Sequence, residues 1–394
     1  MNILEIEKKA CTGCMACSSV CPVHCIMSRY DPEGFAYPEI DEVKCIDCSK
    51  CVKTCPYDNK TELFATRTAY AVQAKDWDNL KNSASGGIAF ELCRQAILDG
   101  GVAYGAIYDE SLRVHHARAE TIQQLQAQQG SKYVQSDFSS IYSQVKEDCI
   151  KGRGVVVVGT PCQIAGLRNF LNHDYTNLLL VDLICHGVPS QKLFDKYLGW
   201  KSKQLRVDRI NDYRFRDKAK GWGTTFKVIA DNKIQYGGAM EEPYYADFEF
   251  ARSYRESCYQ CQYACPERTG DITVGDYWNF FKFHPKSLVD TTKGVSCVLV
   301  NTQRGEDALN GTSSRLQIIL STVEKVNACN SSLTGPAHKP DIREQFYRHI
   351  DAEGFDWSQK RIKKTRAYYK SWIVRHVPKS VKKALKKMKG RMKK

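Results

Sequence analysis

The chain has 394 residues, of which 42% are hydrophobic and 26% are charged, a balance typical of a water-soluble globular protein. No stretch approaches the roughly 18 consecutive apolar residues of a membrane-spanning helix, and no basic segment followed by an apolar one indicates a secretory signal. We therefore expect a cytoplasmic protein, in which 18 cysteines indicate metal binding rather than disulfide bonds.

The net charge of +14 is concentrated near the end of the chain. Sixteen Lys and Arg lie between Lys360 and Lys394, and no acidic residue follows Asp356. The other 42 basic residues are nearly balanced by the 44 acidic ones, so the basic character belongs to a tail.

Residues 1–62 form a small module built on two similar cysteine runs. Each run has the spacing C-x2-C-x2-C-x3-C followed by proline, and the members are Cys11, Cys14, Cys17 and Cys21, then Cys45, Cys48, Cys51 and Cys55. This spacing is typical of bacterial two-cluster ferredoxins, in which the fourth cysteine of each run binds the other 4Fe–4S cluster. One predicted ligand set is therefore Cys11, Cys14, Cys17 and Cys55, and the other is Cys45, Cys48, Cys51 and Cys21. Zinc, or thiols without a redox role, is the alternative, and Cys25 lies outside the pattern.

Residues 66–350 show alternating strand-like and helix-like segments. The expected strands cover 69–74, 102–108, 114–119, 155–158, 178–184, 224–230, 271–274 and 295–301, and the expected helices cover 88–98, 140–149 and 163–171. The sequence therefore predicts an α+β protein: a ferredoxin module, then a mixed α/β body with a partly parallel sheet.

A second cysteine group lies in this body. Cys258 and Cys261 form a C-x2-C pair, Cys265 follows them, and Cys162 and Cys185 each follow a predicted buried strand. Ligands gather at strand ends in open α/β sheets. A third metal site and ordinary buried cysteines are both compatible with this spacing. Four further cysteines are isolated and are expected in the core: Cys93, Cys149, Cys297 and Cys329.

Three turns of small residues are candidates for binding a phosphate. Residues 83–87 (Ser-Ala-Ser-Gly-Gly) precede a predicted helix, and Gly159-Thr160-Pro161-Cys162 lies between a strand and a helix. Helix N-termini favour anions. Gly130-Ser131-Lys132-Tyr133 adds a cation and an aromatic ring. None of the three matches the Rossmann fingerprint or the P-loop.

The tail, residues 356–394, is predicted to be an exposed extension. Apolar residues three or four apart among lysines indicate a basic amphipathic helix: Val377, Val381, Ala384, Leu385, Met388 and Met392. A solvated disordered tail is one interpretation, and peripheral contact with the inner face of the membrane is another. No specific nucleic acid is expected, because a recognition fold is missing around the tail.

With these motifs assembled, the chain resembles the beta-subunit family of coenzyme F-420 hydrogenase and dehydrogenase, in its bacterial branch with an N-terminal two-cluster ferredoxin domain. The motifs that carry the resemblance are Ser85-Gly86-Gly87, Gly130 to Val134, Gly159 to Gln163, Cys185-His186-Gly187-Val188-Pro189, Cys258 to Cys261, Asp271 to Asp276 and Lys293-Gly294-Val295-Ser296. They cover roughly residues 1–310 in order. The tail lies outside the resemblance.

The resemblance implies an FAD-binding iron–sulfur oxidoreductase. A third cluster would be held by Cys162, Cys185, Cys258 and Cys261, with Cys265 as a surplus or competing ligand. The implied flavin-binding residues are Ser85, Gly86, Gly87, Lys132, Tyr133, Gly159, Thr160, Asp276 and Lys293.

The expected function is passage of electrons between 4Fe–4S clusters and FAD, with hydride exchange to a deazaflavin-like or other small redox partner. Lys132 would stabilise the anionic reduced flavin, and His186 would relay a proton or serve as a structural histidine. Ferredoxin or another redox carrier is the expected partner, and the bacterial branch implies a link to surface-polysaccharide biosynthesis. The alternative is a non-catalytic electron-transfer subunit that connects a separate enzyme to ferredoxin.

Overall fold

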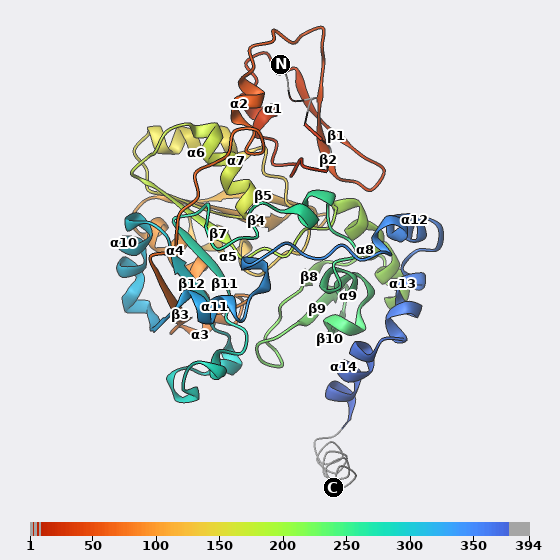
Figure 1. Cartoon of the computed structure of the whole chain (residues 1–394). Coiled ribbons are helices and arrows are strands. Elements are labelled where there is room, and N and C mark those ends of the chain that lie inside the picture. Colours follow the sequence, from red (N-terminus) through yellow and green to blue (C-terminus); the bar gives the residue numbers. More distant parts are fainter. Residues whose placement is uncertain (1–2, 4–5, 8, 378–394) are drawn as a thin grey trace.

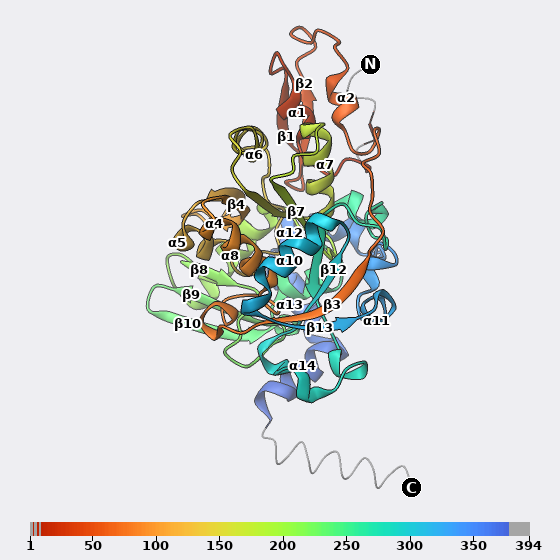
Figure 2. The same ribbon diagram turned by 90° about the vertical axis from the view of Figure 1, so that its left-hand side faces the viewer.

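The structure, a computed structural model, describes residues 3, 6–7 and 9–377, and in these residues it has a cysteine-rich module on a larger α/β body (Figures 1 and 2). The module contains α1 (Ala16–Val20), β1 (Ile26–Tyr30), β2 (Ala36–Ile40) and α2 (Lys50–Thr54). Both helices start within a cysteine run, after a left-handed residue: Met15 (φ 63°) and Ser49 (φ 59°). The duplication in the sequence is thus a duplication in structure.

The body is organised around an eight-stranded mixed sheet with the order β13-β3-β12-β11-β7-β6-β4-β5. Its strands are β3 (Thr68–Ala74), β4 (Val102–Tyr108), β5 (Val114–Ala119), β6 (Val155–Gly159), β7 (Leu178–Leu183), β11 (Ile272–Asp276), β12 (Ser296–Val300) and β13 (Leu316–Ser321). The four central strands, β11, β7, β6 and β4, are parallel, and the outer strands pair antiparallel. The partly parallel sheet predicted from the sequence is therefore present. The carboxyl ends of β6, β7 and β11 meet at one edge, where the predicted site residues begin.

Helices cover the sheet and lie beneath the module. They are α3 (Trp77–Leu80), α4 (Ile88–Leu98), α5 (Ile122–Ala127), α6 (Ile141–Ile150), α7 (Pro161–Leu171), α10 (Gln303–Thr312) and α11 (Val323–Asn327). Both α1 and α2 contact α7, which follows β6 directly. Since α7 begins at the carboxyl edge of the sheet, this contact brings the module to the same edge.

A second, three-stranded antiparallel sheet has the order β10-β9-β8 and packs with the C-terminal helices around an aromatic core. Its strands are β8 (Asp212–Arg214), β9 (Thr225–Ala230) and β10 (Lys233–Gly238), and the helices are α8 (Gln191–Leu205), α9 (Pro243–Glu249), α12 (Arg343–Glu353), α13 (Phe355–Lys363) and α14 (Arg366–His376). Tyr197 of α8 packs against Tyr213, Tyr244 and Phe355 with ring centroids 5.2–5.6 Å apart. Short 3₁₀ helices include η2 (Ala239–Glu241) and η3 (Glu256–Gln260).

The predicted boundary of the tail needs correction. Helix α13 is not an exposed extension, because Phe355 and Ile362 are buried and the Ser358 hydroxyl donates to the buried Asp247 carboxylate. The following helix, α14, is also fixed to the body, since the Ser371 hydroxyl donates to Glu241 over 2.7 Å. The lysine-rich residues 378–394, with most of the predicted amphipathic pattern, lie outside the described residues.

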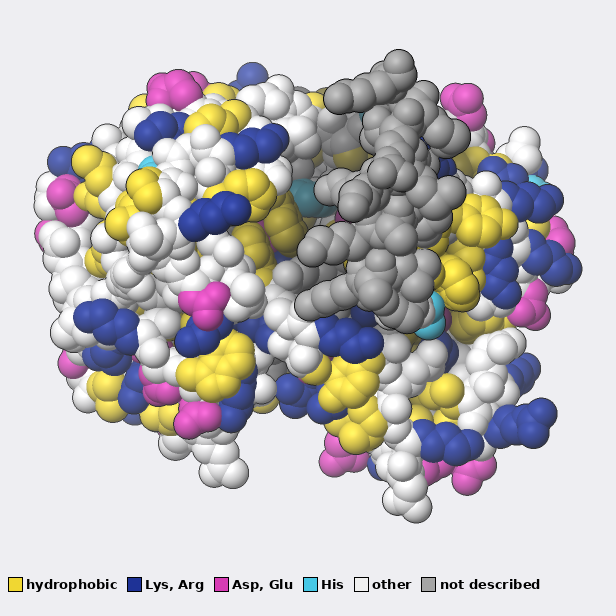
Figure 3. Space-filling view, turned by 90° about the horizontal axis from the view of Figure 1, so that it is seen from below, with side chains coloured by type: hydrophobic (Ala, Val, Ile, Leu, Met, Phe, Trp, Pro, Cys, Tyr) yellow, Lys and Arg dark blue, Asp and Glu magenta, His cyan; other side chains and the backbone are white. Residues whose placement is uncertain are grey.

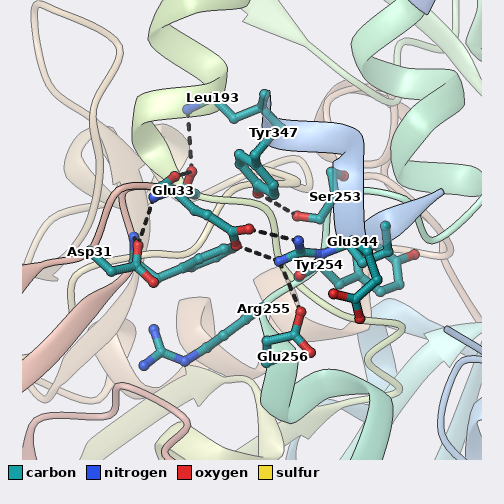
Figure 4. Close-up of polar contacts among 12 residues, drawn as sticks. Asp31, Glu33, Leu193, Ser253, Tyr254, Arg255, Glu256, Glu344 and Tyr347 are labelled. Atoms are coloured by element: carbon teal, nitrogen blue, oxygen red, sulfur yellow. Dashed lines mark hydrogen bonds and ion pairs between the residues drawn. The ribbon is translucent and has the colours of Figure 1, made fainter. Parts of the chain in front are cut away.

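Arg343 of α12 joins the C-terminal part of the body to the module (Figure 4). Its guanidinium is 1% exposed and donates to both carboxylate oxygens of Glu33, over 2.8 and 2.5 Å, in the turn between β1 and β2. Glu256 lies 3.5 Å from the same guanidinium. None of the helices in the described part of the chain has both the length and the apolar character needed to cross a membrane.

We expect Arg343→Ala to destabilise the protein strongly, by about 3 kcal/mol, because breaking a buried ion pair leaves polar groups without partners. The matched control is Glu39→Gln, which removes the ion pair of Arg29 and Glu39 on the exposed side of the same hairpin and should leave stability nearly unchanged. Anaerobic urea denaturation followed by tryptophan fluorescence measures both. Equal midpoints for the two variants would contradict this role of Arg343.

Candidate functional site

The eight cysteines of the module gather in two groups. Cys11, Cys14, Cys17 and Cys55 line one cavity of about 240 Å³. Cys21, Cys45, Cys48 and Cys51 line a second, smaller hollow, beside Cys25. In both groups, three cysteines come from one run and the fourth from the other run.

Three thiols around the first cavity, those of Cys14, Cys17 and Cys55, resist ionisation in the protein alone. Burial raises the pKa of Cys14 to about 11 and that of Cys55 to about 12, and neighbouring thiolates add repulsion. Burial also raises the pKa of Cys17. Four closely spaced thiolates therefore require positive charge between them, which bound metal supplies.

The geometry does not favour a single metal ion. Thiolates held about 2.3 Å from one zinc would lie within about 4 Å of each other. Across residues 3, 6–7 and 9–377, no three Cys, His, Asp or Glu side chains converge as one ion requires. A cubane separates its four thiolates more widely, since each binds a different iron, and each cysteine group has the four thiols that one cubane takes.

A third cysteine group lies at the carboxyl edge of the main sheet. Cys162 lies in the first turn of α7, Cys185 follows β7, and Cys258 and Cys261 belong to the loop that contains η3. Burial and mutual repulsion raise the pKa values of these thiols; that of Cys185 is raised by the three others. Cys265 interacts with Cys261, but its thiol donates to the carbonyls of Gln262 and Glu267 instead of joining the group.

The first and third groups are neighbours across the boundary between module and body. The Cys14 thiol is close enough to Cys162 for its pKa to be raised by that neighbour. Gly166 of α7 permits this approach, because a Cβ there would lie 3.0 Å from the Cys14 sulfur. The Tyr142 hydroxyl donates to the Cys14 carbonyl over 2.8 Å, and Gln262 donates to the Pro56 carbonyl. The three groups thus form a series from the module into the body.

The series ends at a cavity of about 390 Å³ in the body. Cys162 and Cys185 line it, together with these predicted site residues: Ser85, Gly87, Lys132, Tyr133, Gly159, Thr160, His186 and Asp276. Gly86 and Lys293 are not among its described lining residues. Lys293 instead lies 5.4 Å from the Trp77 ring and 3.8 Å from Asp290.

The glycines of the Ser85-Gly86-Gly87 turn are required by packing. A Cβ on Gly86 would lie 2.1 Å from the Val72 carbonyl oxygen, and its N–H donates to the Ser296 hydroxyl over 2.9 Å. Gly87 has φ +84°, a left-handed conformation that favours glycine. This turn places the N-terminus of the eleven-residue helix α4 at the cavity, where Ile88 lines the wall.

Lys132 and His186 are among the titratable side chains that line the cavity. Burial lowers the pKa of Lys132 to about 7, although its ammonium donates to the carbonyls of Ala127 and Gln129 over 3.1 Å. His186 is exposed within the cavity. Desolvation by the surrounding protein lowers its pKa, so its ring is neutral near pH 7. A positive charge on Lys132 therefore becomes more favourable when an anion occupies the cavity.

Arg216 organises one wall of the cavity, and sequence reasoning missed it. This buried guanidinium donates to both oxygens of Asp276, over 2.6 and 3.0 Å, and to the Tyr133 hydroxyl over 3.1 Å. The Trp222 indole also donates to Asp276 and stacks on Trp278 with centroids 4.7 Å apart. Arg216 belongs to no local motif, and its partners lie 60 and 83 residues away in the chain, so no spacing indicates it.

The residues present fit a flavin nucleotide. A planar ring needs an apolar and aromatic slot with a few polar groups, and a diphosphate needs helix N–H groups and cations. The cavity offers Tyr133 and Phe248, stacked with centroids 4.3 Å apart, as well as the N-terminus of α4 and Lys132.

Two family models match separate parts of the chain. Residues 152–326 match the C terminus of the coenzyme F420 hydrogenase/dehydrogenase beta subunit, and residues 10–59 match a 4Fe-4S dicluster domain. The second match covers both cysteine groups of the module, and the first covers all four cysteines of the third group.

Related proteins are similar over most of the chain. An uncharacterized protein of Methanocaldococcus jannaschii is 26% identical, over 76% of this chain and 86% of its own. A subunit of the F(420)H(2) dehydrogenase of Methanosarcina mazei is 23% identical, over 80% of this chain and 85% of its own. A chain of the F420-reducing [NiFe] hydrogenase complex of Methanosarcina barkeri is 18% identical and has a TM-score of 0.44, with 78% of this chain and 94% of that chain covered.

Residues 152–326 therefore match the C-terminal domain of the coenzyme F420 hydrogenase/dehydrogenase beta subunit, and a 4Fe–4S dicluster domain precedes them, as the sequence motifs predict.

Proposed function

We propose that this protein is an iron–sulfur flavoprotein oxidoreductase that passes electrons between 4Fe–4S clusters and FAD, with hydride exchange to a deazaflavin-like or other small redox carrier. The observation that carries the proposal is the series of three cysteine groups ending at the cavity, because Cys162 and Cys185 belong both to the third group and to the cavity wall. Bound clusters supply one-electron chemistry and bound flavin supplies both one- and two-electron chemistry.

We assign ligands to three clusters by the groups described above. The first takes Cys11, Cys14, Cys17 and Cys55, the second takes Cys21, Cys45, Cys48 and Cys51, and the third takes Cys162, Cys185, Cys258 and Cys261. The second group is the one farther from the cavity, and its Cys48 is exposed. We therefore assign this end of the module to exchange with ferredoxin or another redox carrier.

Around the flavin, the side chains of this protein have separate tasks. Lys132 and the N-terminus of α4 supply positive potential for the anionic parts of the cofactor. Arg216 neutralises Asp276 and fixes the Tyr133 ring. His186, exposed in the cavity and neutral near pH 7, is placed to accept a proton during hydride exchange.

The relatives support an oxidoreductase that works with partner subunits. One of them is named as part of a dehydrogenase for F(420)H(2), so the reduced deazaflavin is the first hydride donor to test. The alternative function, a non-catalytic electron-transfer subunit, needs no flavin, and the large cavity with its cations argues against it. The link to surface-polysaccharide biosynthesis stays a prediction.

Anaerobically reconstituted protein is expected to contain about twelve irons in three cubanes and about one FAD per chain. Cys258→Ala should lose part of the iron and of the visible charge-transfer absorption, because it removes a third-group thiol. Cys265→Ala is the matched control and should keep the full iron content, because that thiol is bonded to carbonyls outside the group. Iron analysis and absorption spectra measure both. Full iron in the Cys258 variant would refute the assignment of the third cluster.

FAD binding should weaken as the pH rises above about 7. Lys132 has a pKa of about 7 in the empty cavity, and an anionic ligand raises it, so binding takes up a proton. Affinity is therefore highest below pH 7 and falls by up to about tenfold per pH unit above it. Isothermal titration of flavin-stripped protein with FAD at pH 6 to 8.5 measures this.

The Lys132→Met variant should bind FAD more weakly and with a flatter pH profile. Lys293→Met is the control, because that lysine does not line the cavity, and it should match the unmodified protein. The same pH profile in the Lys132 variant as in the unmodified protein would show that Lys132 does not face the phosphates.

We also propose peripheral contact with an anionic membrane through α14. On one side of this helix, Tyr369, Trp372 and Ile373 are exposed at helical spacing, while Ser371 and Arg375 hold the helix to the body. Figure 3, seen from below, shows hydrophobic and basic side chains spread over the lower surface of the molecule, with acidic ones among them. Exposed aromatic residues beside a basic segment suit the boundary between lipid headgroups and chains.

Membrane binding can be tested by co-sedimentation with vesicles. The full chain should pellet with vesicles rich in phosphatidylserine and stay soluble with neutral ones. Trp372→Glu should reduce pelleting several-fold, whereas Leu320→Glu, an equally drastic change at the exposed edge strand β13, should not. Equal pelleting of both variants would exclude α14 as the contact.

A further inference from the structure

Arg255 differs from the other fully buried arginines of the described chain in having no carboxylate partner. Three arginine side chains are among the largest fully buried groups, Arg255, Arg268 and Arg343. Arg268 pairs with Asp182 over 3.3 Å, and Arg343 pairs with Glu33 and Glu256. Among the described residues, no Asp or Glu lies within 4.0 Å of the Arg255 guanidinium. Figure 4 shows it pointing away from Glu33 and Glu256.

Arg255 contacts the first cysteine run and strand β2, and both of these line the first cavity. Its Nε donates to the Cys11 carbonyl over 2.8 Å, and its Nη2 lies 3.8 Å from the Cys11 sulfur and 2.8 Å from the Ala36 carbonyl. The guanidinium also covers Gly13, where a Cβ would meet Nη1 at 2.7 Å. The Tyr37 ring packs on its face, with the centroid 4.1 Å away.

The backbone of Arg255 is directly hydrogen-bonded to a member of the third cysteine group. It opens the segment that carries Cys258, whose N–H donates to the Arg255 carbonyl over 2.9 Å. The positive charge of Arg255 lowers the pKa of Cys162 and of Cys258, against the larger effect of burial. One cation therefore faces thiols of the first and the third groups together.

A buried charge without a counter-charge is strongly destabilising, and buried ions in proteins are paired or bound to metal centres. The carbonyl and amide oxygens around Arg255 supply hydrogen bonds but no negative charge. A 4Fe–4S cluster with four thiolate ligands is an anion, and it becomes more negative by one charge when reduced.

We propose that Arg255 is the shared counter-ion of the first and third clusters, and that it raises the reduction potentials of both. This inference rests on the proposed function, since it presumes the two clusters. By favouring the reduced form of two neighbouring centres, the cation makes electron transfer from the second cluster into the body more favourable. Arg255 thus acts on the two clusters through its positive charge.

The test is a redox titration of the reconstituted protein, with dithionite as the reductant and EPR as the readout. Arg255→Gln should lower the reduction equilibrium constants of the first and the third cluster at least tenfold, which equals about 59 mV for one electron. The remaining cluster should keep its potential, because Arg255 does not reach the second group. Arg255→Lys, which keeps the charge, should restore most of the shift.

The matched control is Lys44→Gln, which removes an exposed cation next to Cys45 in the sequence. Solvent screens this charge, so all three potentials should stay the same. Unchanged potentials in an Arg255→Gln variant with full iron content would overturn the counter-ion role. Absence of iron from the unmodified protein would instead contradict the proposed function, so the two failures are distinguishable.

A second measurement starts from the unmodified protein and needs only the charge-conserving variant for assignment. In the unmodified protein labelled with ¹⁵N in the arginine guanidinium groups, pulsed EPR of the reduced clusters should detect a weak nitrogen coupling from Arg255. Loss of this coupling in Arg255→Lys would assign it. A reduced protein without any guanidinium coupling would overturn the proposal.

Discussion

The structure depends on the repulsion between thiolates that are held close together in a buried setting. Each cysteine group brings four thiols into one space, and burial raises the pKa of members such as Cys14 and Cys185, so the arrangement is stable only with cationic metal between them. The module has a small core of its own, formed largely by cysteines beside Ile3, Ile26 and Ile40. Metal binding is therefore part of the folding free energy, and the module is expected to lose its shape without it.

The carboxyl edge of the parallel strands explains why three cysteine groups and a cavity form one series. Strand β6 leads to Thr160 and Cys162, strand β7 to Cys185 and His186, and strand β11 ends at Asp276. The module reaches this edge through α7, where Gly166 allows close approach. The proposed electron path and cofactor site thus share one topological feature, the place where parallel strands end.

Local spacing predicted the parts of this protein that depend on neighbours in sequence. The ferredoxin module and most strands and helices of the main sheet follow from cysteine spacing and apolar runs. Helix α8 escaped prediction because Lys201 lies on its buried side and is paired with Glu242, which obscures the apolar pattern. The lysines and arginines of α13 obscure its apolar pattern in the same way, so its packing against the body was not predicted.

The site residues that sequence reasoning missed, Arg216 and Arg255, act through partners far away in the chain. No spacing rule can indicate them, because their partners are distant in the chain. Arg216 binds a carboxylate 60 residues away, and Arg255 binds the carbonyl of a cysteine 244 residues away. Both are buried cations beside the predicted redox centres. Contacts between distant parts of the chain, and not a local motif, therefore place the positive charges beside the site.

The most direct test of the central claim is anomalous diffraction at the iron edge from crystals grown without oxygen. The account predicts three iron clusters in series, two within the module and one between Cys162 and Cys258, with the last beside a flavin in the large cavity. Zinc at these positions, or an empty third group next to a cavity that holds no flavin, would contradict it.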